Sequence, residues 1–447
     1  MHLFRLAILA AAAALTAAAA AARAGARQPV LAFSRKAHRP PRYITSSSVL
    51  PGAINIHLQP HSHDDVGWLK TFDEYLIGRN GSQQQVGGVQ FIYDGVVQAL
   101  ARDSSRTFTA VEMGFFMRWF EEAAAPEDAA AAVELVQRGS LVLSNAGWCM
   151  ADEAVPTFAD MADNLALGHR LVARAFGANA SVLPRVGWQI DPFGHSAAQG
   201  SLFTSGAGFS AMFYGRLDME ERAARIAANA TEYIWRPSRS LGAAAQSFAG
   251  FNIEGYDPPR LPNVSNSPFH FDVTQDTPTQ PAVFGPVQDN PDWDGENTRE
   301  FVAAVLEIAR VHSAYILPDE VDGTVNLAWQ MGTDFNYIAP IQWFHSLDRL
   351  IHYVNLNTSI HNVNLLYSTP QGYADAKLAQ RTSWPLKLDD QFPYWGDTKH
   401  WTWTGFVLPS SHSLPASHSS SPSFLATALP RGHPLSPSTG TSCRAPR

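Results

Sequence analysis

The chain has 447 residues, of which 45% are hydrophobic and 11% aromatic, so it is long and apolar enough to build a sizeable buried core. Its net charge of −8, with no stripe of lysine and arginine, argues against nucleic acid as a partner. The sequence holds 2 cysteines, too few for a disulfide framework, so its stability must come from the packed core.

The N-terminus is typical of a secretory signal peptide. Arg5 precedes an apolar, alanine-rich stretch over residues 6–22, and small residues follow. We therefore expect a signal peptide over residues 1–26, with a low-complexity alanine helix as the alternative, and no membrane span in the mature protein. Asn-x-Ser/Thr sequons agree with a secretory route and occur at Asn80, Asn179, Asn229, Asn263 and Asn357.

Short strand-like runs alternate with helical runs from residue 53 to about residue 406. The clearest strand-like runs are residues 53–58, 141–143, 186–190 and 325–329, and each is followed by turn-forming or polar residues. Strands that alternate with helices predict parallel βα units, arranged as an open sheet or as a barrel. From residue 409 the chain becomes rich in serine and proline, which predicts a disordered tail over residues 407–447.

Two of the intervening helices are predicted from apolar residues at helical spacing. The face of the first is formed by Phe158, Met161, Leu165, Val172 and Phe176. Gly177 is expected to end this helix. The face of the second is formed by Phe301, Val305, Ile308 and Ala309.

Ionisable residues follow three of the predicted strands. The first strand is followed by His61, His63 and Asp65, the third by Asp191 and the fourth by Asp334. In an α/β barrel the carboxyl ends of the strands converge on one face, where catalytic groups assemble. Side chains two positions apart after a strand can point the same way, so His63 and Asp65 could bind one metal ion. Zinc accepts both of these donor types.

The same residues also have purely structural interpretations. The histidine–aspartate cluster after the first strand could be a solvated loop, and Asp191 and Asp334 could each belong to a turn that ends a strand. His195 is expected to be a structural hydrogen-bonding residue rather than a metal ligand. Spacing alone leaves these alternatives open.

Ten segments in chain order carry a more specific signal. They are HSHDDVGWLKT (61–71), FFMRWF (115–120), NAGWCMADEA (145–154), WQIDPFGHS (188–196), FYGRLD (213–218), GYDPPR (255–260), MGTDFNY (331–337), LLYSTP (365–370), DDQFPY (389–394) and WTGF (403–406). Together they resemble the catalytic domain of family-38 α-mannosidases of the lysosomal type. The resemblance implies an α/β fold, a (β/α)7-type barrel of parallel strands, over residues 52–406.

The resemblance also implies a function, that of a retaining exo-α-mannosidase with zinc (Zn2+) as cofactor. The zinc ligands would be His63, Asp65 and Asp191, with Asp191 also the nucleophile and Asp334 the general acid/base. Retaining chemistry needs two such carboxyl groups roughly 5–5.5 Å apart. The mannose subsite would be lined by Trp68, Phe193, Arg216, Tyr256 and Trp403. The substrates would be mannose-containing N-glycans or oligosaccharides, in the lumen of a lysosome or vacuole or outside the cell.

The sequence departs from this family after residue 406. Family members continue into helical and β-rich domains, where a HHDAVSGT motif supplies a further zinc-binding histidine, and the sequence contains no similar motif. We therefore expect a C-terminally truncated chain whose zinc site has one protein ligand fewer. An inactive fragment that binds mannose or metal weakly is one alternative function. A metal-dependent amidohydrolase, suggested by His61 and His63, is another, although further metal-binding histidines for it are not evident.

Overall fold

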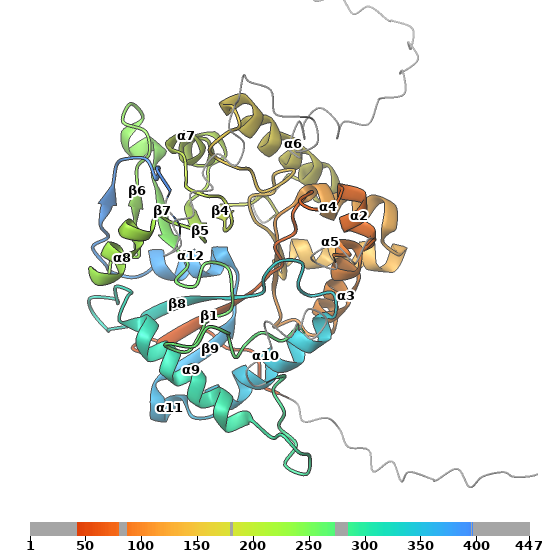
Figure 1. Ribbon diagram of the computed structural model, residues 1–447, viewed down its shortest axis with the longest axis vertical. Coiled ribbons are helices and arrows are strands. Elements are labelled where there is room, and N and C mark those ends of the chain that lie inside the picture. The colour runs from red at the N-terminus through yellow and green to blue at the C-terminus, as the bar shows by residue number, and fades with distance from the viewer. Residues whose placement is uncertain (1–42, 80–86, 179–181, 273–284, 395, 397–447) are drawn as a thin grey trace, which may run out of the picture. The chain divides into compact units, whose positions relative to one another are not determined.

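The central sheet is built around strand β1 (Ile54–Pro60). A computed structural model of the protein describes residues 43–79, 87–178, 182–272, 285–394 and 396. In it, β1 pairs in parallel with β8 (Val325–Met331) on one side and with β9 (Val363–Tyr367) on the other (Figure 1). Because β1 has a neighbour on each side and packed elements on its faces, every residue after Ile54 in this strand is buried.

The remaining described strands form two further sheets. One joins β2 (Phe108–Ala110) to β3 (Leu141–Leu143), and the other has the order β10 (Leu386–Lys387), β6 (Glu232–Trp235), β7 (Ser247–Phe251), β5 (Ala211–Tyr214) and β4 (Val186–Gln189). The described strands pair in parallel except for β6 and β7. The prediction of an α/β fold with mostly parallel strands is therefore confirmed. The antiparallel pair departs from uniformly parallel strands because the connection between β6 and β7 is too short for a crossover helix.

Single hydrogen bonds and bridges connect these ladders at their ends. His61, just after β1, forms a parallel bridge with Thr109 of β2. The N–H of Asn145, just after β3, donates to the carbonyl of Val186 in β4 at 3.2 Å. Strands β1, β2, β3 and β4 are therefore successive neighbours, and their carboxyl ends lie at the same edge.

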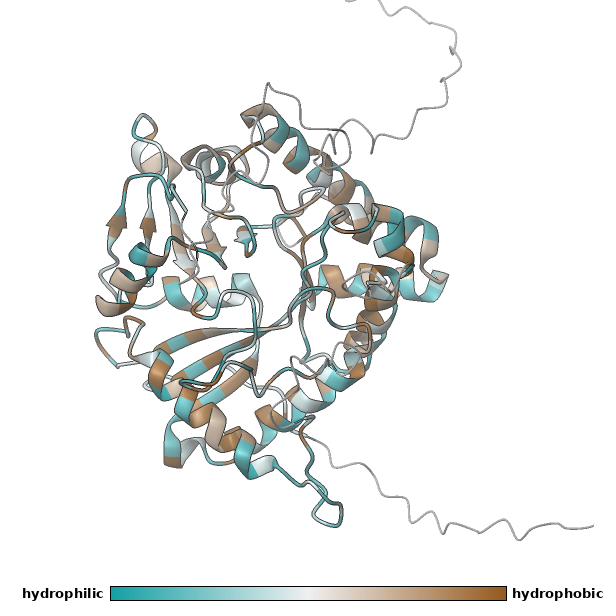
Figure 2. Ribbon diagram, in the orientation of Figure 1, coloured by the Kyte–Doolittle hydropathy of each residue, from teal (hydrophilic) through white to brown (hydrophobic). Residues whose placement is uncertain are grey.

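Helices form most of the connections, as the alternating pattern predicted. They are α2 (Phe72–Ile77), α3 (Val89–Arg102), α4 (Met113–Arg118), α5 (Pro126–Gln137), α6 (Phe158–Phe176), α7 (Ala197–Ser201), α8 (Met219–Ala227), α9 (Thr298–Ser313), α10 (Pro340–Asn355), α11 (Thr358–His361) and α12 (Pro370–Leu378), with two short π-helices, η1 (Trp119–Ala123) and η2 (Leu202–Gly206), and one 3₁₀ helix, η3 (Gly242–Ala245). Helices α9 and α10 contact β8 and β9, respectively (Figure 1). Figure 2 shows hydrophobic and hydrophilic residues on the same helices, as expected when one face covers the core.

The two predicted helical faces can be compared with the structure. The face on α9 is confirmed, because its four predicted residues are all fully buried. Helix α6 begins with a capping box between Thr157 and Asp160 and ends before Gly177, as predicted. Its predicted face is wrong at Phe158, which is 55% exposed. Phe158 is the first helical residue, and its side chain leans toward the open N-terminal end, where no preceding turn packs against it.

Several predicted features fall on residues that the structure does not describe. The signal peptide, the serine/proline-rich tail, Asn80, Asn179 and Trp403 lie outside the described residues. The sequon residues Asn229, Asn263 and Asn357 occupy exposed positions. Within the described part of the chain, none of the helices has the length and apolar character needed to cross a bilayer.

A buried ion pair connects Arg106, two residues before β2, to α10. Arg106 donates from Nε and Nη2 to the carboxylate of Asp348 at 3.3 and 2.5 Å, and Tyr367 donates to the same carboxylate at 2.7 Å. We expect Asp348→Ala to lower the free energy of unfolding by about 3–5 kcal/mol, because it leaves the Arg106 charge buried without its partner. Urea unfolding followed by tryptophan fluorescence measures this loss. Glu307→Ala, which removes an ion pair with Arg310 at the surface, is the control and should change stability little.

Candidate active site

The predicted catalytic and metal-binding residues follow the carboxyl ends of strands. His63 and Asp65 follow β1, Asp191 follows β4, Arg216 follows β5 and Asp334 follows β8. These positions are where an α/β fold of mostly parallel strands brings polar side chains from different parts of the sequence together. The structure therefore places the residues on connections that leave the same end of the ladders.

The backbone fixes His63 beside Asp334. Beyond the ends of β1 and β8, the N–H of His63 donates to the carbonyl of Thr333 at 3.2 Å, and the N–H of Phe335 donates to the carbonyl of His63 at 3.0 Å. These bonds continue the register of the β1–β8 ladder into the site. The position of His63 relative to Asp334 is thus set by main-chain hydrogen bonds.

His63, Asp65 and Asp191 form a compact group of possible metal ligands. The Nε2 atom of His63 lies 3.4 Å from Oδ1 of Asp65 and 3.4 Å from Oδ2 of Asp191. Ligand atoms of the three residues all lie within 4.8 Å of one another. The 3.4 Å separations exceed those of a normal hydrogen bond, and one nitrogen with two carboxylate oxygens is a donor set that zinc accepts. These residues therefore fit a metal ion.

The charge balance of this group also suits a cation. Burial lowers the pKa of His63, but the adjacent carboxylates of Asp65 and Asp191 outweigh it and hold the pKa well above its ordinary value. The negative charges of the two carboxylates thus strongly favour a positive charge at Nε2. A bound cation would supply this charge and displace the proton.

Glu112 faces the other ring nitrogen of His63 and was not predicted from the sequence. Its Oε1 atom lies 4.0 Å from Nδ1 of His63, and Glu112 is only 1% exposed. Neither carboxylate oxygen of Glu112 has a hydrogen-bonding partner in another described residue. Metal-binding histidines usually donate their second N–H to a carboxylate, and Glu112 stands where such a carboxylate would be. The available signal was an acidic residue directly after a short apolar run, which is weak because β2 has only 3 residues.

Arg216 holds the second carboxylate oxygen of Asp191. Its Nε and Nη2 atoms donate to Oδ1 of Asp191 at 2.9 and 2.5 Å, and Nε also lies 2.9 Å from the Asp191 carbonyl oxygen. Burial raises the pKa of Asp191, but His63 and Arg216 together outweigh it and leave the pKa below its ordinary value. Asp191 therefore stays ionised under mildly acidic conditions.

Asp334 has the opposite electrostatic environment. Burial raises the pKa of its carboxyl to about 7, and the negative charges of Asp191 and Asp65 add to this effect, although His63 opposes it. A carboxyl group with this pKa retains a proton in mildly acidic solution. Two carboxyl groups beside His63 are thus held in different protonation states, a pattern typical of an acid and a nucleophile working together.

Aromatic rings surround the Asp191–Arg216 pair. The guanidinium of Arg216 lies 4.7 Å from the ring centre of Phe193 and 5.6 Å from that of Tyr256. Tyr256 also approaches His63, with 5.3 Å between the ring centres. Trp68, on the connection after β1, is 41% exposed. The structure thus brings Phe193, Arg216 and Tyr256 together, as the subsite prediction requires.

His61 does not join the metal-binding group. Its ring is fully buried, and Nε2 donates to the carbonyl of Tyr256 at 3.0 Å. Burial lowers the pKa of His61 to about 3, so the imidazole is neutral. The hydrogen bond directs Nε2 to the backbone, and His61 is not part of the described group of ligand atoms around His63, so the structure does not support the amidohydrolase alternative.

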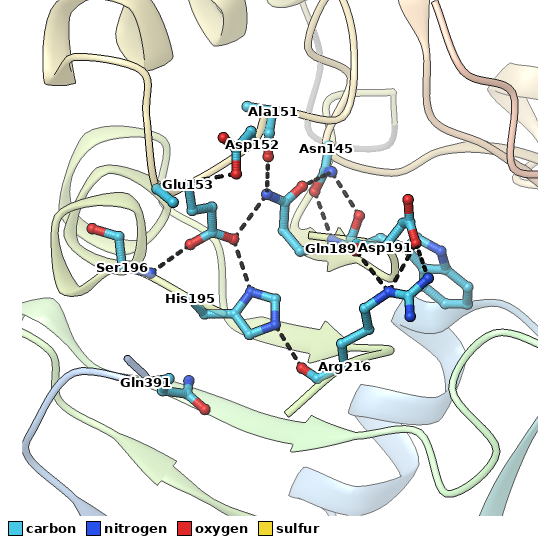
Figure 3. A network of polar contacts seen from close by, with 12 residues as sticks. Asn145, Ala151, Asp152, Glu153, Gln189, Asp191, His195, Ser196, Arg216 and Gln391 are labelled. Atoms are coloured by element: carbon cyan, nitrogen blue, oxygen red, sulfur yellow. Dashed lines mark hydrogen bonds and ion pairs between the residues drawn. The ribbon is translucent and has the colours of Figure 1, made fainter. Parts of the chain in front are cut away.

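A buried polar network lies behind Asp191 and Arg216 (Figure 3). Glu153 accepts hydrogen bonds from Gln189 Nε2 at 2.9 Å and from Ser196 N at 2.7 Å, and its Oε1 lies 2.9 Å from Nδ1 of His195. The Nε2 atom of His195 donates to the carbonyl of Arg216 at 2.8 Å. The prediction that His195 is a structural hydrogen-bonding residue is confirmed. Glu153 was not predicted because it lies in a loop without periodicity.

Comparison with known proteins places this geometry in context. The family described as the glycosyl hydrolases family 38 N-terminal domain matches residues 53–398. A probable alpha-mannosidase of Arabidopsis thaliana is 43% identical over 368 residues, which cover 81% of this chain and 33% of that protein. The lysosomal alpha-mannosidase of Homo sapiens is 38% identical over 367 residues, covering 81% of this chain and 34% of that protein.

The matches include a third curated relative and a solved structure. The alpha-mannosidase of Canavalia ensiformis is 40% identical over 365 residues, covering 82% of this chain and 34% of that protein. The crystal structure of an alpha-mannosidase from Enterococcus faecalis has a TM-score of 0.49 at 14% identity, covering 76% of this chain and 31% of that one. This chain therefore spans about one third of the length of the curated relatives that it matches.

Proposed function

The chain belongs to glycosyl hydrolase family 38, and from this premise we propose that it is a retaining exo-α-mannosidase acting on terminal α-linked mannose of N-glycans. Asp191 is the nucleophile and Asp334 the general acid/base. The observation that carries this proposal is the contrast between their environments: the pKa of Asp191 lies below its ordinary value, whereas burial raises that of Asp334 to about 7.

Each carboxyl group then has a defined task. An oxygen of Asp191 attacks the anomeric carbon while Asp334 gives its proton to the departing glycosidic oxygen, which leaves mannose covalently bound to Asp191. Asp334, now ionised, takes a proton from a water molecule, whose oxygen attacks the same carbon and releases Asp191. Arg216 keeps the carboxylate of Asp191 oriented through both bonds to Oδ1.

His63, Asp65 and Asp191 would hold a zinc ion. When bound, zinc would supply a Lewis-acid contact for two neighbouring hydroxyls of the sugar, which favours the cis diol of mannose. Phe193, Tyr256 and Trp68 would offer aromatic faces to the apolar side of the pyranose, and Trp403 would complete this subsite.

The domain and its location in the cell complete the proposal. We assign the catalytic domain to residues 52–406 as a (β/α)7-type barrel, supported by the bridges that connect β1 to β2 and β3 to β4. The relatives named lysosomal alpha-mannosidase support a lysosomal or vacuolar lumen as the site of action. Exposed Asn229, Asn263 and Asn357 would be available for N-glycosylation there.

Hydrolysis of an aryl α-mannoside by the full chain tests the function. We expect release of α-mannose as the first product by proton NMR, loss of turnover with a metal chelator, and recovery on addition of zinc. Zinc content measured by mass spectrometry should fall to zero with the chelator and in His63→Ala. A zinc-loaded chain without turnover would contradict the proposal and favour an inactive fragment that binds mannose or metal weakly.

Glu112 should increase the affinity of the site for zinc. We expect Glu112→Gln to weaken zinc binding by about 10–100-fold, because an amide accepts the Nδ1 proton of His63 less strongly than a carboxylate does. Competition with a chromogenic zinc chelator measures this change without any need for turnover. Glu134→Gln, on the polar side of α5, is the control and should leave zinc affinity unchanged. Equal affinities in Glu112→Gln and the parent chain would contradict this role.

A further inference from the structure

We propose that Glu153 and His195 are positioning residues that hold the main chain of Arg216, and through its guanidinium the carboxylate of Asp191. The inference rests on the proposed function in that Asp191 is the nucleophile. The ring nitrogens of His195 contact Glu153 and the carbonyl of Arg216 rather than Asp191. His195 acts through Arg216, whose carbonyl accepts the hydrogen bond from His195 and whose side chain grips Asp191 (Figure 3).

The hydrogen bonds of His195 fix the orientation of its ring. The carbonyl oxygen of Arg216 can only accept, so Nε2 of His195 must carry the proton between them. Glu153 Oε1 faces Nδ1 at 2.9 Å, so a second proton lies between the carboxyl group and the ring. The ring is fully buried, and it lies with its centre 4.0 Å from that of Tyr214. A ring held at both nitrogens and on its face has little freedom to rotate.

Glu153 is itself held by residues on both sides of Asp191. Its Oε2 accepts from the N–H of Ser196, the residue after His195, and its Oε1 accepts from Gln189, the last residue of β4. Gln189 also donates to the carbonyl of Ala151. Asp191 lies between Gln189 and His195 in the sequence, so Glu153 fastens the chain on both sides of the proposed nucleophile.

Arg216 is held from the opposite side by the β4–β5 ladder. The N–H of Gly215 donates to the carbonyl of Gln189 at 3.2 Å. A Cβ atom at Gly215 would lie 1.8 Å from the carbonyl oxygen of Ile190, so these two backbone segments are in direct contact. Because His195 binds the carbonyl of Arg216, the backbone is restrained both at Gly215 and at Arg216. Its guanidinium therefore extends to Asp191 from a restrained backbone, as accurate placement of a reacting group requires.

A pair of substitutions at His195 separates positioning from a merely structural role. In His195→Asn the amide nitrogen takes the place of Nδ1, so the contact with Glu153 remains and the bond to Arg216 is lost. In His195→Gln the amide nitrogen takes the place of Nε2, so the bond to Arg216 remains. We expect His195→Asn to lower kcat by about 100-fold with little change in KM, and His195→Gln to recover at least about ten-fold of this loss.

Combination with Arg216→Lys tests whether His195 acts through Arg216. If it does, His195→Asn lowers kcat much less in the Arg216→Lys background than in the parent chain. His57→Asn is the control, because His57 is equally buried, with both ring nitrogens hydrogen-bonded, but contacts Ser368 and Asn326 instead. Its effect should be the same in both backgrounds. Equal losses in His195→Asn and His195→Gln, or full additivity with Arg216→Lys, would overturn the inference.

A spectroscopic measurement keeps this test independent of turnover. With arginine labelled with ¹⁵N at Nε, the Arg216 signal is identified by its disappearance in Arg216→Lys. We expect its Nε–H to be protected from exchange in the parent chain and in His195→Gln, and unprotected in His195→Asn. If the parent chain is inactive but this pattern holds, the proposed function fails while the positioning role stands. Unchanged protection in His195→Asn would overturn the positioning role.

Discussion

Asp191→Ala is expected to reduce hydrolysis of an aryl α-mannoside by at least about 10⁴-fold, the scale on which the loss of a covalent nucleophile acts. We expect this loss because both carboxylate oxygens of Asp191 have specific partners. Oδ2 faces the proposed metal-binding group and Oδ1 is held by Arg216, so no neighbouring described carboxylate shares this position. The side chain of alanine leaves a gap between the anomeric carbon and the guanidinium.

Azide provides the decisive measurement for this variant. A small anion can enter the space left by Asp191 and attack the anomeric carbon directly, so we expect added azide to restore turnover and to yield β-mannosyl azide, of inverted configuration. Asp163→Ala, which removes an exposed carboxyl group on α6, is the control and should keep the parent rate. Mannosyl azide of the α configuration from Asp191→Ala would contradict the assignment of Asp191 as nucleophile.

Asp334→Ala is expected to show a loss that depends on the leaving group. For a methyl or alkyl α-mannoside, whose leaving group needs a proton, we expect kcat/KM to fall by about 10²–10⁴-fold. For a dinitrophenyl α-mannoside, which needs no proton, kcat/KM should stay close to that of the parent chain. Azide should attack the mannose bound to Asp191 and give α-mannosyl azide. Equal losses on both substrates would contradict a role for Asp334 as the acid.

The pH profile follows from the same carboxyl group, with the sign set by the direction of its pKa. Asp334 must be protonated to act as the acid, and burial raises its pKa to about 7 in the metal-free site, so activity should fall as rising pH removes this proton. A bound cation lowers this pKa, which moves the basic limb of the metal-loaded enzyme below pH 7. The ionised form of Asp191 is favoured down to strongly acidic pH, so acid should cost little activity until the metal is released. Asp334→Ala should lack the basic limb.

The sequence predicted the fold where a single strand or helix carries its own pattern. β1 alternates apolar and polar residues, and α9 repeats apolar residues at helical spacing, so both were predicted without knowledge of their neighbours. Strands β5 and β7 are buried along their whole length, so they lack alternation and resemble any short apolar run. The antiparallel pairing of β6 with β7 depends on partner choice, which no local pattern reveals.

The candidate site was predictable to the extent that its residues follow predicted strands. His63 and Asp65 could be paired from the two-residue period, and the structure brings their side chains to 3.4 Å. Glu112 and Glu153 were not predicted from the sequence, because tertiary packing alone brings each of them to the site. Glu112 approaches His63 from the N-terminus of α4, after β2, and Glu153 approaches His195 from a loop. A single sequence carries no spacing rule for such contacts.

The main-chain bridge between His63 and Asp334 has a consequence for how the site could fail. Amide hydrogen exchange reports the opening of individual backbone hydrogen bonds, and two residues that share one ladder open together. The N–H groups of His63 and Phe335 should therefore exchange at matching rates, both governed by separation of the ends of β1 and β8. Thermal loosening would then remove the metal-binding imidazole and the general acid in one step. A heated sample should consist of fully competent and fully incompetent molecules, with no population that keeps the acid in place while the metal has gone.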